Sequence, residues 1–526
     1  MLRAFSSSSA ASSAARVALL GERVETGEEA ERGAQEIFSF VSCWNLWSGF
    51  PCWNLWMCSS LFRLCVLFVT LGNMTTALRM ALPKLPLPPM LLSNEPGTWA
   101  YDTMSRRVRT EILGREVLEA NAALLETMLD AKAKLLELDA ELAAGASTPL
   151  RHIQGSGPDL ETWKDIMAEY VDGSKTWLEA PWLVTEFYLY RRIMEALDYF
   201  NTGIDPFADS KRKGLESAFA SMEALAPKVL ATVEMNFVAN ATGSFQGSLT
   251  PKGENQFPAD QLEANLRLFT LISLWGNRMD LSLWPAGSEG NVADAFSEVL
   301  AAGEANLLAD DFPSLLSVCA EAKANGGRRF DIVVDNAGFE LVTDLCLADF
   351  LVSSGVASEV VFQLKGHPTF VSDALAKDLR QHVFALRGLD KTKFPGCTAL
   401  GERWQNMLAD RRWRMREDMF WVQPLAFWEL PPHLRDDIGA GSALVFTKGD
   451  ANYRRLLGDR SWALDAPFTD VCGYFPTTLC ALRTLKAELG CGMSNEQVER
   501  AAAADEKWQV NGKFGVIQVA PPAASE

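Results

Sequence analysis

The stretch FDIVVDNAGFE (Phe330–Glu340) decides the fold, because it changes abruptly from an apolar, β-branched run to a polar turn. Its first half is typical of a buried strand, and the periodic apolar segment that follows, Leu341–Ser353, is typical of a helix. A second run, EVVFQLKG (Glu359–Gly366), repeats the change and precedes a segment that we predict to be helical from about Ser372. Strand–helix–strand–helix at this spacing predicts a parallel α/β unit.

Three further strands are predicted towards the C-terminus. They are SALVFTKG (Ser442–Gly449), a run near Thr478–Leu485, and GKFGVIQVA (Gly512–Ala520), which we expect at the edge of the sheet. Apolar residues three and four apart predict helices before the first strand. These helical segments are Ser105–Ala144, Leu160–Phe200, Leu215–Thr232 and Asn291–Ala324, the last broken near Pro313, with a loop at Asn240–Pro258. The fold class is therefore α/β, with a helical N-terminal region packed on a C-terminal α/β domain that has a mainly parallel sheet.

We expect three parts along the chain: residues 1–81, a leader or dispensable segment; 82–325, the helical region; and 326–526, the α/β catalytic region. The first part begins with Arg, Ser and no acid over residues 1–20, and an apolar, Trp-rich stretch, Ile37–Leu71, follows with CWNLW twice. Within this stretch, Cys58–Leu71 could be proposed as a membrane span, but it is short of the ~20 apolar residues that a span needs and contains Arg63. An organellar leader, a membrane anchor and translated upstream sequence all stay open. The expected compartment is the cytoplasm, or an organelle if residues 1–36 are a transit peptide.

Composition narrows the class of protein. Hydrophobic residues make up 48% and charged residues 22% of the 526, which is a globular balance, and the formal net charge is −18. Such an acidic chain lacks the Lys and Arg excess that nucleic-acid binding needs. The ten cysteines form no CxxC pair, so we expect reduced, buried thiols rather than a zinc site.

Polar residues follow four of the predicted strands at the point where each strand ends. Ligands of open α/β sheets bind beyond the carboxyl ends of the strands, so these side chains are candidates for a site. Carboxylate and amide oxygens suit Mg²⁺, Mn²⁺ or a similar ion, and basic residues from other strands could hold a phosphate across it. The residues at the four ends are Asp335, Asn336 and Glu340; Lys365, His367 and Asp373; Lys448, Asp450, Asn452 and Arg454; and Arg483, Thr484 and Lys486.

Each of these residues also has an ordinary structural interpretation. Asp335 and Asn336 could be a strand-ending turn with an N-cap, and Asp373 could be a carboxylate in the first turn of a helix. A histidine such as His367 is more often a loop residue than a catalyst. The argument for a site is their number, because four strand ends with four carboxylates, two Asn and five cations are hard to explain as unrelated turns.

Several of these segments also resemble a known family. DNAGFELVTDLCLADFL (Asp335–Leu351), LKGHPTFVSDA (Leu364–Ala374), FTKGDANYRRLLGD (Phe446–Asp459) and LRTLK (Leu482–Lys486) are similar to the damage-control phosphatases. The match is to their sugar-phosphate phosphatase branch, which is also described as acidic-residue (protein-glutamate) O-methyltransferase. Further matching segments lie at Leu87–Thr103, Trp177–Leu197, Asp205–Phe207 and Asn511–Gln518, so the resemblance covers about Leu82–Ala520.

The resemblance implies a metal-dependent phosphomonoesterase. It implies a divalent metal, with Mn²⁺ as first choice and Ni²⁺, Co²⁺ or Mg²⁺ as alternatives, on Asp335, Asn336 and Asp373. From that placement we expect Asp335 and Asp373 to be the catalytic residues, and either could be the general base. The implied substrates are phosphometabolites such as fructose 1-phosphate and fructose 6-phosphate. Ala451 departs from the family, where a larger apolar residue is expected. The expected substrate-binding residues are Asp335, Asn336, Lys365, Asp450, Ala451, Asn452, Tyr453, Arg454, Arg483, Thr484 and Lys486.

A second class stays open beside the phosphatase. The methyltransferase interpretation would link Glu340 and Asp373 to S-adenosylmethionine, but Asn336–Gly338 offers a single glycine where such a site usually has a Gly-rich loop. A non-enzymatic scaffold ranks third. The sequence leaves the attacking group open between a water and a carboxylate, and it predicts a small phosphorylated metabolite as partner, no nucleic acid, no membrane for the catalytic body, and no particular oligomeric state.

Overall fold

The computed structural model describes residues 82–234, 259–282 and 301–523. The chain divides into two compact units, Met1–Arg79 and Met80–Glu526, and the following description concerns the second. The predicted leader at 1–81, the predicted loop Asn240–Pro258 and the first part of the predicted helix Asn291–Ala324 lie outside the described residues. The division of the second unit at residue 325 stays a prediction.

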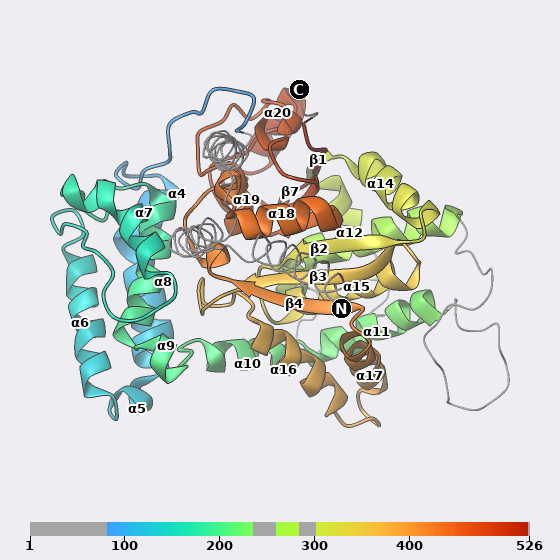
Figure 1. Cartoon of the computed structure of the whole chain (residues 1–526), viewed down its shortest axis with the longest axis horizontal. Helices are drawn as coiled ribbons and strands as arrows, with labels where there is room; N and C mark the ends of the chain where they lie inside the picture. The colour runs from blue at the N-terminus through green and yellow to red at the C-terminus, as the bar shows by residue number, and fades with distance from the viewer. Residues whose placement is uncertain (1–81, 235–258, 283–300, 524–526) are drawn as a thin grey trace, which may run out of the picture. The chain divides into compact units, whose positions relative to one another are not determined.

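A seven-stranded sheet in the order β1-β7-β6-β5-β2-β3-β4 forms the centre of this unit (Figure 1). The strands are β1 (Leu307–Asp310), β2 (Arg328–Val333), β3 (Ala357–Lys365), β4 (Trp413–Asp418), β5 (Ser442–Lys448), β6 (Thr478–Thr484) and β7 (Gly515–Ala520). Strands β6, β5, β2, β3 and β4 run parallel, whereas β7 pairs antiparallel with β6 and parallel with β1. The predicted α/β class with a mainly parallel sheet and a helical N-terminal region is confirmed.

Three details of the sheet differ from the prediction. Strand β7 is not at the edge but lies between β1 and β6. Strand β1 lies within Asn291–Ala324, which we predicted to be helical, and Pro313 stands in the first turn of the helix that follows. Strand β4 was not predicted, because WRMRED at the other edge is mostly charged. Short or polar edge strands carry little pattern, since only their pairing with a neighbour defines them.

Both faces of the sheet are buried at its central strands, and successive residues of these strands alternate between the faces. Ile332 and Val334 belong to one hydrophobic cluster and Val333 to the other, and Phe446 and Val445 divide in the same way. This alternation follows from the two-residue period of a strand. The sheet therefore supports two separate helical layers, as parallel sheets usually do.

The helices divide between these two layers. The first cluster is the one that contains Ile332. Its other residues come from the helices α10 (Ala208–Ser217), α11 (Phe219–Glu234), α12 (Ala259–Ser282), α14 (Phe312–Ala324), α15 (Phe339–Ser353), α16 (Ala376–Arg387) and α17 (Pro395–Ala409). The second packs α18 (Pro432–Gly441), α19 (Asp450–Leu456), α20 (Phe468–Cys472), α21 (Asn495–Ala504) and the N-terminal helices η1 (Thr103–Glu119), α6 (Leu129–Ala143), α7 (Leu160–Asp172) and α8 (Trp182–Ala196). The short elements α4 (Trp99–Asp102), α5 (Ala122–Leu125), α9 (Tyr199–Thr202), η2 (Met419–Val422) and η3 (Phe427–Glu429) also pack in the second cluster.

The cysteines of the described residues are buried and free. This agrees with the prediction of reduced thiols, and the six are Cys319, Cys346, Cys397, Cys472, Cys480 and Cys491. None of the helices in the described ranges combines the length and the apolar character that a membrane crossing requires.

Helices α12 and α15 pack closely at Gly276. A Cβ placed on Gly276 would overlap the Thr343 hydroxyl and lie 3.2 Å from the Thr343 Cβ. We expect Gly276→Ala to destabilise the protein by about 1–3 kcal/mol, the usual cost of overpacking a core. The measurement is the urea-unfolding midpoint. The matched control is Gly214→Ala in α10, where a Cβ meets nothing within 4 Å and the change should be neutral or stabilising; equal effects at both positions would contradict this account.

Candidate active site

The parallel register brings three strand ends into one row. Val333 at the end of β2 pairs with Gln363 of β3 and with Thr447 of β5. Two residues further along each strand lie Asp335, Lys365 and Gly449. The carboxyl ends of these neighbouring strands therefore meet at the same edge of the sheet, as the sequence predicted.

Backbone pairing joins the loops that follow β2 and β3. Asn336 and Asp373 form an isolated antiparallel bridge. Beside it, the Ala337 N–H donates to the Ser372 carbonyl at 2.7 Å, and the Ala374 N–H donates to the Asp335 carbonyl at 2.8 Å. Asp373 is thus a loop residue held against Asn336, and α16 begins at Ala376 rather than at Ser372 as predicted.

Three carboxylates are buried around this bridge. Asp335, Asp373 and Glu340 are 7%, 1% and 6% exposed. The Asn336 Nδ2 donates to Asp335 Oδ2 at 3.0 Å and to Glu340 Oε2 at 2.9 Å, and Asn336 Oδ1 accepts from the Ser372 hydroxyl at 2.5 Å. Burial, together with the charges of Asp373 and Glu340, raises the pKa of Asp335 well above its usual range. The Asn336 amide thus bridges two of the buried carboxylates, and burial is the main reason why the charge of Asp335 is unfavourable.

Two buried lysines reach the same edge. Lys365 Nζ lies 3.0 Å from Asp373 Oδ2 and donates to Asn452 Oδ1 at 3.4 Å, so it connects the end of β3 to α19. Burial raises the pKa of Asp373, and the Lys365 charge opposes that rise. On the other side, Lys448 Nζ lies 3.2 Å from Asp344 Oδ1 and 3.8 Å from Glu340 Oε1.

Lys448 is held from behind by helix α12. Its Nζ donates to the Ser273 carbonyl, and the Ser273 hydroxyl donates to Asp344 Oδ1 at 2.6 Å. Burial raises the pKa of Asp344 to about 7, with Lys448 opposing the rise. Nothing in the local sequence around Ser273 or Asp344 marked either residue, because their partners come from other helices.

Gly449 is required where β5 turns into α19. Its φ is +83°, and a Cβ at this position would overlap the carboxylate of Asp335. Asp335 therefore packs directly against the backbone of the next strand end. Any L-residue at 449 would be strained and would displace the carboxylate.

The loop after β3 is anchored in the N-terminal helical region. Phe370 and Val371 both have positive φ, 47° and 65°, which is unfavourable for these side chains and especially for a β-branched residue. The Phe370 ring packs 4.8 Å from Phe187 and 5.0 Å from Tyr190, both on α8. The aromatic contacts hold a strained turn two residues before Asp373.

Asp450 and the β6 end form a separate polar group. Asp450 Oδ1 accepts from Arg483 Nε at 2.7 Å and from the Lys486 N–H at 3.1 Å. Arg483 also donates to the carbonyls of Ala487 and Leu489, so its guanidinium holds the turn after β6. The Lys486 side chain is exposed, and its charge lowers the pKa of Asp335. Lys486 is thus the exposed cation of this group, whereas Arg483 is buried.

The remaining predicted substrate contacts point in other directions. Tyr453 donates to Gln518 Oε1 at 2.7 Å and is 1% exposed, and Arg454 pairs with Asp459 at 2.8 Å and Glu186 at 2.6 Å. Thr484 lies in the β6 ladder opposite Gly515, and Ala451 is half-buried. Of the five predicted contacts on the stretch Asp450–Arg454, only Asn452 joins the carboxylate cluster through a contact in the described structure.

The residues of this cluster have the donor types that a divalent metal prefers. Asp335, Asn336 and Asp373 supply two carboxylates and an amide, which are hard oxygen donors, and the backbone bridge between Asn336 and Asp373 brings them to one place. The Asn336 amide presently turns its nitrogen towards Asp335, so ligation through its oxygen requires the amide to rotate. Within 82–234, 259–282 and 301–523, no group of three His, Cys, Asp or Glu side chains could hold a metal ion by itself. A metal at this place would therefore need the Asn336 amide as a ligand. With the amide turned, the donor set fits.

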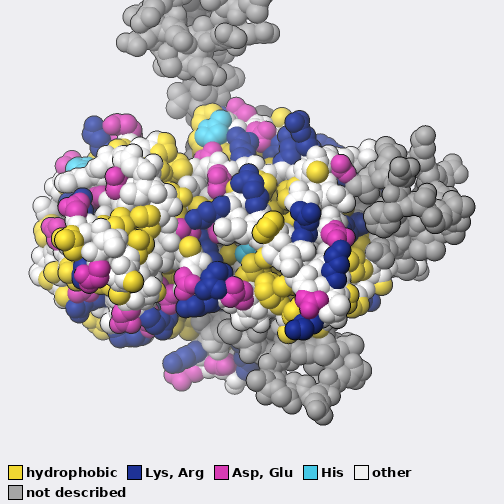
Figure 2. Space-filling model, turned by 90° about the horizontal axis from the view of Figure 1, so that it is seen from below, with side chains coloured by type: hydrophobic (Ala, Val, Ile, Leu, Met, Phe, Trp, Pro, Cys, Tyr) yellow, Lys and Arg dark blue, Asp and Glu magenta, His cyan; other side chains and the backbone are white. Residues whose placement is uncertain are grey.

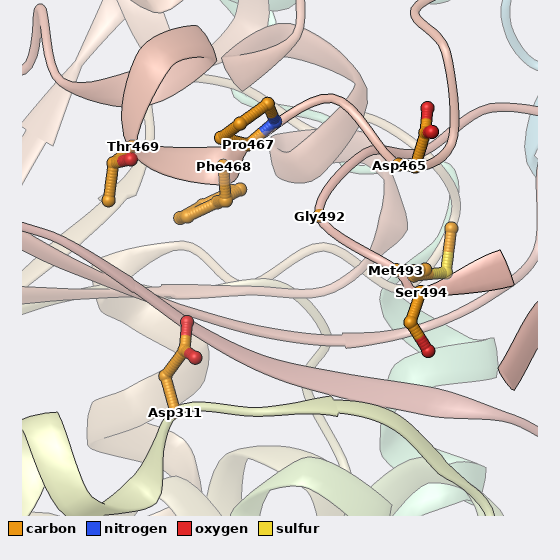
Figure 3. A pocket seen from close by; sticks show the side chains of 8 residues that line it. All are labelled: Asp311, Asp465, Pro467, Phe468, Thr469, Gly492, Met493 and Ser494. Carbon is orange, nitrogen blue, oxygen red and sulfur yellow. The ribbon is translucent and has the colours of Figure 1, made fainter. Parts of the chain in front are cut away.

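A surface hollow of about 340 Å³ lies elsewhere (Figure 3). None of the predicted site residues lines it; its lining residues are Asp311, Asp465, Pro467, Phe468, Thr469, Gly492, Met493 and Ser494. Basic and acidic side chains are interspersed on the face shown in Figure 2, so the net negative charge does not gather there as a patch of one sign. The chemistry of the strand ends, rather than the hollow, marks the candidate site.

The chain is similar in sequence to one family of known proteins. Residues 102–501 match the family model described as damage-control phosphatase ARMT1-like domain. The chain belongs to this family. It is 31% identical to damage-control phosphatase ARMT1 of Danio rerio over 459 residues, with 83% of this chain and 98% of the relative covered. The Rattus norvegicus and Homo sapiens proteins of the same name are 32% and 31% identical, and each comparison covers 83% of this chain and 99% of the relative. The resemblance stated from the motifs is therefore confirmed.

The ion pairs of Arg454 with Glu186 and Asp459 predict a structural role for this residue. Removing its side chain would leave Glu186 and Asp459 buried without their partner, so we expect Arg454→Met to destabilise the protein by about 3–5 kcal/mol. The measurement is the free energy of unfolding in urea. The control is Arg212→Met, whose ion pairs are exposed and whose loss should change stability little. A stable Arg454→Met protein would show that the pairing is not structural.

His367 provides a test of pH dependence. It is fully buried, and burial lowers its pKa from 6.5 to about 4, so the unfolded chain takes up a proton below pH 6.5 that the folded protein does not. Stability from this group is complete above pH 6.5 and falls as the pH drops towards 4, by about 3 kcal/mol in total. His367→Gln should therefore lose less stability than the wild type between pH 7 and 4.5, measured by urea unfolding. His433→Gln, which leaves His367 in place, should behave like the wild type.

Proposed function

We propose that the chain is a metal-dependent phosphatase that hydrolyses sugar phosphates, such as fructose 1-phosphate and fructose 6-phosphate. The observation that carries this proposal is the meeting of Asp335, Asn336 and Asp373 with Lys365 at one edge of the sheet. The family adds support, because the curated relatives are named damage-control phosphatases. An acidic protein that binds an anion needs local positive charge, and this edge offers both lysines and a place for a cation.

Asp335, Asp373 and the turned amide of Asn336 would hold the divalent cation, with Mn²⁺ as first choice. When bound, such an ion polarises a phosphoryl oxygen and supplies positive charge where negative charge develops. The relief of the crowding among Asp335, Asp373 and Glu340 would favour its binding. The fit rests on the hard oxygen donors of these three residues.

The chain's own cations would complete the site. Lys365 is fixed between Asp373 and Asn452, so its ammonium group has a defined position before any substrate arrives. The exposed Lys486 can meet an anion from solvent, while Asp450 and Arg483 keep the turn that carries it in place. Phosphoryl transfer depends mainly on positioning and on electrostatic stabilisation, and preorganised charges of this kind supply both.

The proposal is tested by phosphate release from a panel of sugar phosphates with Mn²⁺ and with EDTA. The same protein is assayed for methyl transfer from labelled S-adenosylmethionine to protein carboxylates. Metal-dependent phosphate release without methyl transfer supports the proposal. Methyl transfer without phosphate release would favour the methyltransferase instead, and activity that is equal in EDTA would remove the metal from the mechanism.

Asp335→Asn should separate function from stability. The substitution removes a proposed metal ligand, so we expect phosphate release to fall about 100-fold or more. It also removes a charge that burial, Asp373 and Glu340 disfavour, so the melting temperature in EDTA should stay the same or rise. The control is Asp465→Asn in the surface hollow, which should leave turnover unchanged. If instead Asp465→Asn abolished activity and Asp335→Asn did not, the site would be misplaced.

A further inference from the structure

The His382 side chain connects two backbone groups beneath the candidate site. His382 lies on α16 and is 2% exposed. Its Nε2 accepts from the Gly338 N–H at 2.7 Å, and its Nδ1 lies 2.7 Å from the Asp378 carbonyl oxygen. A carbonyl can only accept, so Nδ1 carries the proton and Nε2 is the acceptor. The imidazole is therefore neutral and held in one tautomer.

Gly338 ends the turn that presents Asp335 and Asn336. Its φ of 76° and ψ of −146° are accessible essentially to glycine alone, and it is the N-cap of α15 with no side-chain cap. The residue is buried, so its N–H would be costly without a partner. Ser372 holds the first half of the turn, through Asn336 and Ala337. His382 holds the second half.

His382 is itself held by an ionic network that reaches the helical region. The Asp378 carboxylate accepts from the Leu375 N–H at 2.9 Å and from Lys211 at 2.8 Å. Lys211 lies on α10, beside α16 (Figure 1), and is also 3.4 Å from Asp205. Because Lys211 and Asp378 are both buried, this network fixes the start of α16 and hence the direction of the imidazole.

We propose that His382 is a positioning residue of the candidate active site: through Nε2 it fixes Gly338, and thereby the direction in which Asp335 and Asn336 face. This inference rests on the proposed function, because it assigns His382 an effect on cation binding and turnover. Outer residues that orient metal ligands typically change metal affinity or activity by about 10–100-fold when they are replaced. His382 makes no contact with the carboxylates themselves, so it acts only through the turn.

The neutral state of His382 supports this role. Burial lowers the pKa of His382, and the charged groups that face it are Asp378, which opposes that fall, and Lys211, which adds to it. A protonated Nε2 could no longer accept from Gly338. Burial thus keeps Nε2 unprotonated, so that it can accept the hydrogen bond from the Gly338 N–H.

Three substitutions test the role by reach and chemistry. His382→Gln places an amide oxygen near the position of Nε2 and can still accept from Gly338, whereas His382→Asn is shorter and cannot. His382→Phe keeps the ring shape without an acceptor. We expect the Asn and Phe variants to lose about 10–100-fold in Mn²⁺ affinity and in phosphate release, and the Gln variant to stay within about threefold of the wild type.

Mn²⁺ affinity is measured by the electron paramagnetic resonance of free Mn²⁺, and phosphate release and the melting temperature in EDTA are measured in parallel. Equal Mn²⁺ affinity and turnover in folded Gln, Asn and Phe variants would overturn the inference, even if their melting temperatures fell. If the Phe variant does not fold, the comparison of Gln with Asn decides. A wild-type protein that neither binds Mn²⁺ nor releases phosphate would overturn the proposed function and this inference together. An active wild type whose variants are unaffected would overturn this inference and leave the proposed function standing.

Discussion

The short backbone pairing between Asn336 and Asp373 is the constraint on which the candidate site depends. It joins the loops after two neighbouring parallel strands, and it forces Asp335, Asp373 and Glu340 into one buried cluster. Carboxylates brought this close repel one another, and burial adds to the cost of their charge. Protein stability alone would not favour such a cluster. A buried, unfavourable group of this kind is typical of a functional site, where stability is exchanged for a prepared charge distribution.

The surrounding structure keeps this unfavourable arrangement in place from several sides. Lys365 and Lys448 approach the carboxylates from β3 and β5, and each is held by a polar group of another element, Asn452 on α19 and Ser273 on α12. The strained turn at Phe370 is held by aromatic side chains of α8. The helical N-terminal region therefore contributes to the site although it supplies none of the cluster's charged groups.

The same structure shows why charged residues cannot be assigned to a site from their position in a motif alone. In the stretch from Asp450 to Arg454 successive side chains turn by about 100°, so they cannot all face one ligand. Asn452 faces Lys365, Tyr453 packs towards β7, and Arg454 pairs with Glu186 of α8 and with Asp459. A row of polar residues at the start of a helix thus supports the site, the core and the contact between regions at once.

The sequence by itself determined the strands β2, β3, β5, β6 and β7, the mainly parallel sheet and the strand ends at which the polar residues gather. These features are local, since a strand is recognised by its own apolar run and its end by the polar turn that follows. It did not determine that β7 lies inside the sheet, that β1 and β4 are strands, or that His382, Ser273 and Ser372 support the site. Those features depend on partners distant in the chain, and only the packed structure brings the partners together. The sequence also did not determine the direction of each side chain, because that direction depends on how the tertiary fold orients each helix.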